Sequence, residues 1–293
     1  MHSSPLRYPG GKALMTQFFA ELFRVNNFLN VRYAEPYAGG AGAAINLLLE
    51  DAVDEIIIND ANIGIYSFWD ALIKDSEHFI QKIQDIPVTL EEWYRQKEIF
   101  KSSDKPSFEL GIATFFLSRT NRSGIITGGA IGGITEEKQK EATYKIDCRF
   151  NKDNLIPKLE AIAKQRKRIT VSNNDALAFL RNLANDVFVY LDPPYYIKGK
   201  SLYMNHYTEN DHRQLARYLQ NDADFTWILS YDDVPQIREL YSDFNLYRFS
   251  LKYTVETKRT GYELLTHSRN IYFPENIEIR RSRRDNINLT RIV

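Results

Sequence analysis

Short apolar runs that alternate with helix-like stretches mark two parts of the chain. The runs are rich in β-branched and aromatic residues, and they lie at residues 31–35, 55–59, 168–172, 187–191, 225–231, 246–253 and 270–273. Such alternation is typical of βαβ units that build a mostly parallel sheet. The last two runs are predicted to pair as a hairpin at the end of that sheet. The pattern therefore predicts an α/β domain formed by both ends of the chain.

A segment of different amino-acid composition separates the second run from the third. It is rich in helix formers and aromatic residues and then in glycine, as in the stretch SGIITGGAIGG at 123–133. Glycine at this density favours a loop or hairpin over a helix. We therefore predict one domain formed by residues 1–60 together with 165–293, and a second domain, residues 61–164, inserted into it.

Length and composition fit a globular protein with a substantial core. The chain has 293 residues, of which 43% are hydrophobic, and its 38 Lys and Arg balance 38 Asp and Glu. This balance argues against a uniformly basic nucleic-acid-binding protein but leaves local basic patches open. The single cysteine excludes a disulfide framework and a cysteine-based metal site. Since the sequence shows neither an N-terminal apolar region nor an apolar stretch of membrane-spanning length, we expect a cytoplasmic protein without a membrane segment.

The residues Asp192, Pro193, Pro194 and Tyr195 directly follow the apolar run 187–191. The predicted buried strand ends there because proline cannot continue a hydrogen-bond ladder. Ligands of open α/β sheets bind beyond the carboxyl ends of such strands, where this carboxylate and this ring would project. Carbonyl groups and a carboxylate at this place suit an amino group, and the aromatic ring suits a flat substrate. A turn with a surface acid is the alternative that these residues alone leave open.

Two features near the first two runs suit a nucleoside. The segment EPYAGGAG at 35–42 places small residues at a strand-to-helix turn, where the backbone can approach a ligand closely. Asp60 ends the second run about 20 residues after Gly39, the position of an acid that accepts hydrogen bonds from a ribose diol. The segment lacks the Gly-Lys-Ser/Thr ending of a Walker A loop, so it does not support phosphate binding.

Two further polar residues have alternative interpretations. Lys12, in the segment RYPGGK at 7–12, suits a ligand carboxylate, with Tyr8 packing on an apolar part of the ligand. An exposed turn with a solvated lysine is the alternative. Asp175 follows the third run and suits the N-cap of the next helix or an acceptor for an adenine amino group, and the two roles are compatible.

In this order, the segments RYPGGK, EPYAGGAG, IIIND, NNDALAF and DPPY resemble the Dam-like family of DNA adenine-N6 methyltransferases that use S-adenosylmethionine. The resemblance covers nearly the whole chain, with the cofactor motif, recognition region and DPPY in the order of the α group. It implies a mostly parallel, seven-stranded, Rossmann-like methyltransferase sheet with an inserted, mostly helical target-recognition domain. Further similar segments are WILSYDD at 227–233 and RTGYELL at 259–265. Two residues depart from the family pattern, because Tyr37 stands in place of phenylalanine and Ala41 in place of a later glycine.

The resemblance also implies roles for individual residues. Lys12 and Asp192 would hold the methionine carboxylate and amino group of the cofactor, Asp60 its ribose and Asp175 its adenine. The full predicted cofactor set is Tyr8, Gly11, Lys12, Glu35, Pro36, Tyr37, Gly39, Gly40, Asp60, Asp175, Ala176 and Asp192. The predicted catalytic set is Asp192, Pro193, Pro194 and Tyr195, and the reaction requires no metal.

The predicted chemistry begins with an adenine flipped out of the duplex. The Asp192 carboxylate and the Pro193 carbonyl would accept the two N6 hydrogens, which favours a more tetrahedral nitrogen and stabilises the positive charge that develops on it. The ring of Tyr195 would stack on the base. By family analogy, Asp at position 192 favours adenine over cytosine-N4, and a relative that methylates protein glutamine would carry Asn there.

DNA recognition is predicted from the segment SRTNRSG at 118–124, which resembles the family's Asn-Arg-Ser/Thr-Gly stretch and precedes the glycine-rich loop. Arg119, Asn121, Arg122 and Arg149 are the predicted DNA contacts, with surface salt bridges as the alternative for the arginines. The implied partner is double-stranded DNA. The target sequence, a companion endonuclease of a restriction-modification system and the oligomeric state stay open, although we expect a monomer. A non-catalytic DNA-binding homologue, or a methyltransferase of the same fold that acts on RNA or another planar amino substrate, is the alternative function.

Overall fold

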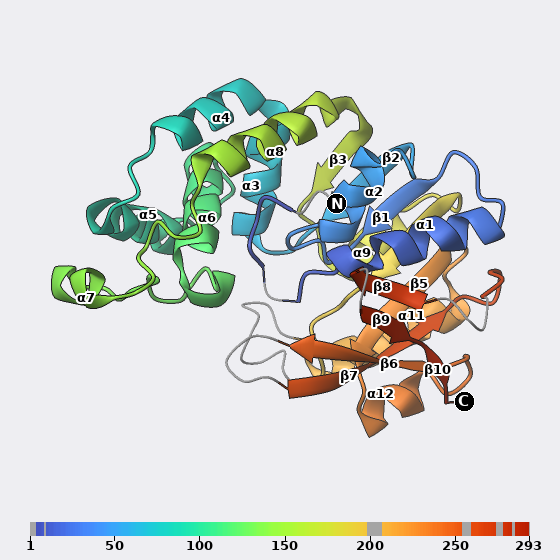
Figure 1. Cartoon of the computed structure of the whole chain (residues 1–293). Helices are drawn as coiled ribbons and strands as arrows, with labels where there is room; N and C mark the ends of the chain where they lie inside the picture. The colour runs from blue at the N-terminus through green and yellow to red at the C-terminus, as the bar shows by residue number, and fades with distance from the viewer. Residues whose placement is uncertain are drawn as a thin grey trace.

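A mixed eight-stranded sheet forms the centre of the structure, a computed structural model that describes residues 4–8, 10–197, 207–253, 259–273, 278–282 and 285–292. Figure 1 shows the sheet and its covering helices on one side of the molecule and a group of helices, α4 to α8, on the other. The predicted α/β class, with a mostly parallel sheet and many helices, is confirmed.

The sheet combines a parallel half and an antiparallel half. Its strands are β1 (Arg32–Glu35), β2 (Glu55–Asn59), β3 (Ile169–Ser172), β4 (Val187–Leu191), β5 (Thr226–Asp232), β6 (Tyr247–Tyr253), β7 (Arg259–His267) and β10 (Thr290–Arg291), in the order β10-β6-β7-β5-β4-β1-β2-β3. The five strands from β5 to β3 are parallel, whereas β7 is antiparallel to β5 and β6, and β10 is antiparallel to β6. β1 lies inside the sheet, with β2 and β3 on one side of it and β4 and β5 on the other. The carboxyl ends of β1 and β4 therefore form the switch point at which open α/β sheets bind ligands.

The sequence predicted six strands to within one residue at each end, but the last strand was wrong. The strand that pairs with β6 is β7, and residues 270–273 lie outside every strand. The apolar residues there pack in the core without forming a strand, as Phe273 does against Phe18. The side chain of Asn26 exchanges hydrogen bonds with the backbone of Tyr272 and so holds this segment in place. The predicted count of seven strands was also wrong. The polar C-terminal tail adds β10 to the sheet and forms a separate hairpin of β8 (Glu278–Ser282) and β9 (Asp285–Asn288).

Strand β4 shows how the sheet builds two cores. All five of its residues are buried, and they alternate between the faces of the sheet because side chains of a strand have a period of two. Phe188 and Tyr190 pack against Phe19 of the first helix on one face. Val187, Val189 and Leu191 pack in a second core on the other face. The helices that accompany the sheet strands along the chain are α1 (Thr16–Val25), α2 (Gly42–Leu49), α3 (Ile63–Lys74), α9 (Ala176–Arg181), α11 (Glu209–Asn221) and α12 (Pro235–Leu240).

The inserted segment folds into helices around an aromatic core. These helices are α4 (Ser76–Asp85), α5 (Leu90–Ser102), α6 (Phe108–Thr120), α7 (Glu136–Glu141) and α8 (Lys152–Lys164). Phe79 and Phe115 pack on Phe68 of α3, so α3 belongs to the core of this part as well. The boundary predicted at residue 61 stays a prediction. Across the described ranges of the chain, every helix is too short or too polar to cross a membrane.

Candidate active site

A cleft opens to solvent at the switch point between β1 and β4, the place where open α/β sheets bind ligands. All twelve residues of the predicted cofactor set line it. Pro194 of the predicted catalytic set lines it too, whereas the side chains of Pro193 and Tyr195 are buried and lie outside its lining. Sequence segments far apart in the chain therefore meet at one place.

The turn after β1 needs glycine at position 39. The φ angle of Gly39 is +47°, and a Cβ atom built there would lie 2.7 Å from the ring of Tyr8. The carboxylate of Asp60 holds this turn, because its Oδ2 accepts a hydrogen bond from Gly39 N at 2.8 Å and its Oδ1 accepts one from Asn62 N at 2.9 Å. Ala41, a departure from the family pattern, has a left-handed φ of +46°, a conformation in which glycine is less strained. The backbone of this loop thus forms a close-fitting wall of the cleft.

Glu35 and Asp60 are among the carboxyl groups of the cleft that have raised pKa values. Burial raises the pKa of Asp60 to about 6, against the lowering effect of its two backbone hydrogen bonds. Burial raises the pKa of Glu35 to about 8, although Tyr33 and the amide of Ala44 donate hydrogen bonds to its Oε1. Groups of this kind favour a positively charged ligand, because a nearby cation stabilises their ionised form.

Lys12 is the cation at the inner end of the cleft. Its side chain is only 6% exposed, and its Nζ lies 3.0 Å from Asp192 Oδ2 and 3.7 Å from Glu263 Oε1. The same ammonium donates hydrogen bonds to Tyr195 OH at 2.9 Å and to the carbonyl of Gly10 at 3.2 Å. The alternative of a solvated lysine on an exposed turn is therefore wrong.

The carboxylate of Asp192 is partnered on both oxygens and still faces the cleft. Its Oδ1 accepts a hydrogen bond of 3.0 Å from Ser230 Oγ, which also lies 2.7 Å from Tyr190 OH. Burial raises the pKa of Asp192 and Lys12 lowers it. Its side chain is 18% exposed, so a ligand in the cleft can reach it.

Four residues at the site were not singled out from the sequence, namely Tyr190, Tyr207, Ser230 and Glu263. Ser230 carried a usable signal, because it is a polar residue between apolar neighbours in a buried strand, and a buried polar group requires a partner. Glu263 carried none, because its strand mixes charged, polar and apolar residues. Tyr207 also lines the cleft, and its hydroxyl lies 2.5 Å from Tyr37 OH. The family's usual phenylalanine has no hydroxyl for this contact, so the departure at Tyr37 has a structural explanation.

Asp175 lies at the rim of the cleft and caps a helix. Its Oδ1 accepts hydrogen bonds from the backbone amides of Leu177 and Ala178 at 3.0 and 3.1 Å. The predicted N-cap of α9 is confirmed. The compatible role, acceptance of a hydrogen bond from an adenine amino group by the other carboxylate oxygen, stays a prediction.

The predicted DNA contacts fall into two classes. Arg122 and Arg149 are exposed. Arg119 instead donates to the carbonyls of Pro5 at 2.5 Å and Ser4 at 3.3 Å. Asn121 is fully buried, and its side chain accepts a hydrogen bond from Trp93 and donates to the carbonyls of residues 125 and 126. Asn121 therefore shapes the loop and Arg119 anchors the N-terminal segment in this conformation, and base contact by either residue stays a prediction.

Positive charge gathers where the N-terminal segment meets the inserted helices. We call Arg7, Arg119, Arg149 and Lys158 the basic cluster. Burial and Arg7 lower the pKa of Arg119 to about 10, and burial and Arg149 lower the pKa of Arg7. Burial and Arg119 likewise lower the pKa of Lys158. Arg7 thus interacts electrostatically with Arg119 and Arg149, and Arg119 interacts with Lys158, a local gathering of positive charge that suits the binding of an anion.

Comparison with known proteins gives one family over most of the chain. The family model of D12 class N6 adenine-specific DNA methyltransferases matches residues 8–255. The type II methyltransferase M.MjaIII of Methanocaldococcus jannaschii is 24% identical over 287 residues, which cover 89% of this chain and 96% of that protein. A crystal structure of a Legionella pneumophila protein of family DUF519 is 12% identical, with a TM-score of 0.34 over 91% of this chain and 88% of that one.

Proposed function

Because the chain belongs to the D12 class N6 adenine-specific DNA methyltransferase family, we propose that the cleft between β1 and β4 is its active site. The reaction is the transfer of a methyl group from S-adenosylmethionine to the exocyclic amino group of adenine in DNA. The observation that carries the proposal is the buried Lys12–Asp192 pair at the switch point of the sheet. Family membership favours this reaction over a non-catalytic DNA-binding role and over an RNA substrate.

The residues of the cleft fit the chemical groups of the cofactor. S-adenosylmethionine supplies a methyl group bonded to a positively charged sulfur, and it also carries an ammonium group, a carboxylate and a ribose diol. Lys12 would hold the carboxylate, Asp192 the ammonium group and Asp60 the diol. The turn at Gly39 leaves no room for a Cβ atom, which suits a backbone wall in contact with a ligand.

We propose that Asp192 also prepares the acceptor nitrogen. The lone pair of adenine N6 is delocalised into the ring, so the nitrogen is a poor nucleophile. Hydrogen bonds from N6 to the Asp192 carboxylate and the Pro193 carbonyl turn the lone pair away from the ring and stabilise positive charge on the nitrogen. The lone pair forms the new nitrogen–carbon bond, and one N6 proton is released to water. Flipping the base costs a few kcal/mol, which contacts in the cleft offset.

The affinity for S-adenosylmethionine is expected to fall as the pH decreases from about 7 to about 5. The pKa of Asp60 in the free protein is raised to about 6, so its carboxylate is ionised above that pH and protonated below it. Only the ionised form accepts hydrogen bonds from both ribose hydroxyls, and each pH unit below the pKa lowers the affinity by up to about tenfold. Calorimetric titration at a series of pH values measures this dependence.

The variant Asp60→Asn tests the origin of that pH effect. It should bind the cofactor more weakly at neutral pH and lose the pH dependence between about 5 and 7 that we assign to Asp60. Glu35, whose pKa is raised to about 8, is still present in this variant, so any pH dependence of the affinity that comes from Glu35 should persist and serves as the internal reference. An unaltered affinity and pH dependence would place the ribose elsewhere.

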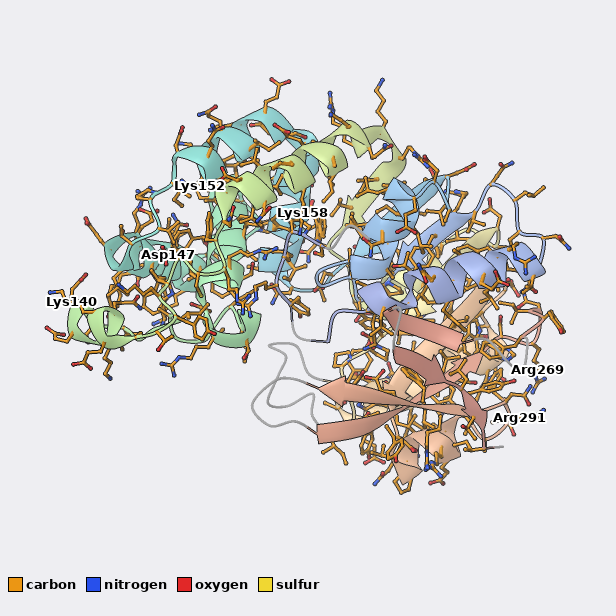
Figure 2. The ribbon with its side chains drawn as sticks, in the orientation of Figure 1. Lys140, Asp147, Lys152, Lys158, Arg269 and Arg291 are labelled. Carbon is orange, nitrogen blue, oxygen red and sulfur yellow. The ribbon has the colours of Figure 1, made fainter. Side chains whose placement is uncertain are left out.

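We propose that the basic cluster binds the DNA backbone beside the active site. Arg7 belongs to the segment that carries Lys12, and Arg119 donates hydrogen bonds to the carbonyls of Ser4 and Pro5 just before that segment. Figure 2 shows Lys158 on the side of the helical group nearer the sheet, whereas Lys140 lies at its outer end. DNA phosphates would relieve the mutual repulsion of these cations, which otherwise raises the free energy of the unbound protein.

Substitution of Arg149 by alanine is expected to reduce the dependence of DNA affinity on salt. Loss of one phosphate contact lowers the slope of log K against log salt by about 0.9. The exposed Lys140 of α7 provides the matched control, and Lys140→Ala should leave the slope unchanged. Fluorescence anisotropy with duplex DNA at several salt concentrations measures both. Equal slopes for the two variants would remove Arg149 from the interface.

A further inference from the structure

Glu263 is a buried carboxylate at the active site with no role in the chemistry described above. It lies on β7, opposite Asp232 of β5, and its side chain has no exposed surface. A carboxylate in such a place is costly unless charged or polar partners compensate for lost hydration. Its partners therefore indicate what it does.

The partners of Glu263 are the two side chains that also contact each other beside Asp192. Tyr195 OH donates a hydrogen bond to Glu263 Oε1. Lys12 Nζ lies 3.7 Å from the same oxygen and donates to Tyr195 OH at 2.9 Å. Glu263 thus fixes the hydroxyl of the DPPY tyrosine and one side of the ammonium that pairs with Asp192.

The charges of this group do not balance within it. One ammonium, Lys12, serves two carboxylates, Asp192 and Glu263, so the three ionised side chains together carry one negative charge. An ion pair of Lys12 with Asp192 alone would neutralise the carboxylate that has to hold cationic groups. The second carboxylate shares this ammonium, so Lys12 is not committed to Asp192 alone, and the negative charge of Glu263 works against Lys12 by raising the pKa of Asp192.

We propose that Glu263 is a positioning residue for methyl transfer. It holds Lys12 and the hydroxyl of Tyr195 while Asp192 exchanges its contact with Lys12 for contacts with the cofactor and the adenine. Asp192 has to exchange Lys12 for the ammonium group of the cofactor and the N6 hydrogens of adenine. Glu263 keeps the ammonium and the ring in place during that exchange, because its own contacts to them do not involve Asp192. This inference rests on the proposed function of Asp192.

The variant Glu263→Gln tests the inference, since it keeps the shape of the side chain and removes its charge. We expect kcat to fall between about 10-fold and about 100-fold, the cost of a slightly misplaced active-site group. Glu92→Gln is the matched control, because Glu92 is also buried and hydrogen-bonded but lies on α5, away from the cleft. It should leave kcat unchanged.

The pH profile of kcat separates positioning from a general loss of stability. Glu263 raises the pKa of Asp192, so Glu263→Gln should move the acidic limb of the profile to lower pH while the plateau falls. A structural defect alone lowers the plateau without moving the limb. The titratable groups that interact electrostatically with Asp192 are Lys12, Tyr33, Glu35, Tyr190, Tyr231 and Glu263.

The outcomes distinguish this inference from the proposed function. Unchanged kcat and an unmoved limb in Glu263→Gln, together with a strongly slowed Asp192→Asn enzyme, would overturn the role of Glu263 alone. An active Asp192→Asn enzyme would overturn the proposed function instead. If Glu263→Gln does not fold, Tyr195→Phe breaks the link to Glu263 with the ring intact. A fall in kcat then supports the inference, and an unchanged kcat overturns it.

Discussion

Replacement of Asp192 by asparagine is expected to lower the rate of methyl transfer by about 100-fold to about 1,000-fold, the usual effect of removing one preorganised electrostatic contact to a transition state. Asparagine has the same shape and still accepts the hydrogen bond from Ser230. It carries no negative charge, so it cannot stabilise the positive charge that develops on N6. The rate is measured in a single turnover with labelled cofactor and duplex DNA.

The same change on the surface provides the control for Asp192. Asp186 is 66% exposed and pairs with Arg32 at the opposite end of β4 from Asp192. Asp186→Asn should keep the full rate, because a surface ion pair contributes about 1 kcal/mol or less to stability and nothing to the cleft. Near-normal turnover by Asp192→Asn would show that the carboxylate is not needed for the reaction.

Replacement of Lys12 by methionine is expected to have the second large effect, on both cofactor binding and stability. Methionine fills similar space but leaves two carboxylates, Asp192 and Glu263, without their shared cation. Removal of one partner from a buried ion pair costs about 3–5 kcal/mol of the free energy of unfolding. Affinity for S-adenosylmethionine should also fall by about 100-fold, since a charge-assisted hydrogen bond contributes up to about 3 kcal/mol.

Calorimetry and denaturant unfolding measure these two effects of Lys12→Met. Lys74→Met is the matched control, because Lys74 pairs with Asp70 on the surface and its side chain is 71% exposed. That change should cost less than about 1 kcal/mol and leave cofactor affinity unaltered. Unchanged cofactor affinity in Lys12→Met, with the expected loss of stability, would reduce Lys12 to a structural role.

The sequence predicted the parallel half of the sheet well because its strands are short apolar runs with clear ends. β4, for example, is apolar throughout and stops at two prolines. The antiparallel edge was harder to predict. β7 mixes charged, polar and apolar residues, and the polar strand β10 owes its place to pairing with β6 rather than to burial.

The site was predictable where it follows strand ends and unpredictable where it depends on contacts between distant segments. Asp60 and Asp192 were found because each follows a buried strand. The link from Lys12 through Tyr195 to Glu263 joins residues far apart in sequence, so only the fold reveals it. Arg119 shows the converse limit, because an arginine that anchors backbone carbonyls has the same sequence pattern as one that contacts DNA.

The most direct test of the central claim is to map the methyl groups that the purified protein adds to unmethylated genomic DNA. The protein and its Asp192→Asn variant are incubated with methyl-labelled S-adenosylmethionine, and modified bases are located by single-molecule sequencing. The account predicts N6-methyladenine at one recurring motif for the unaltered protein and a strongly reduced signal for the variant. Methyl groups on cytosine, or equal adenine methylation by both proteins, would contradict it.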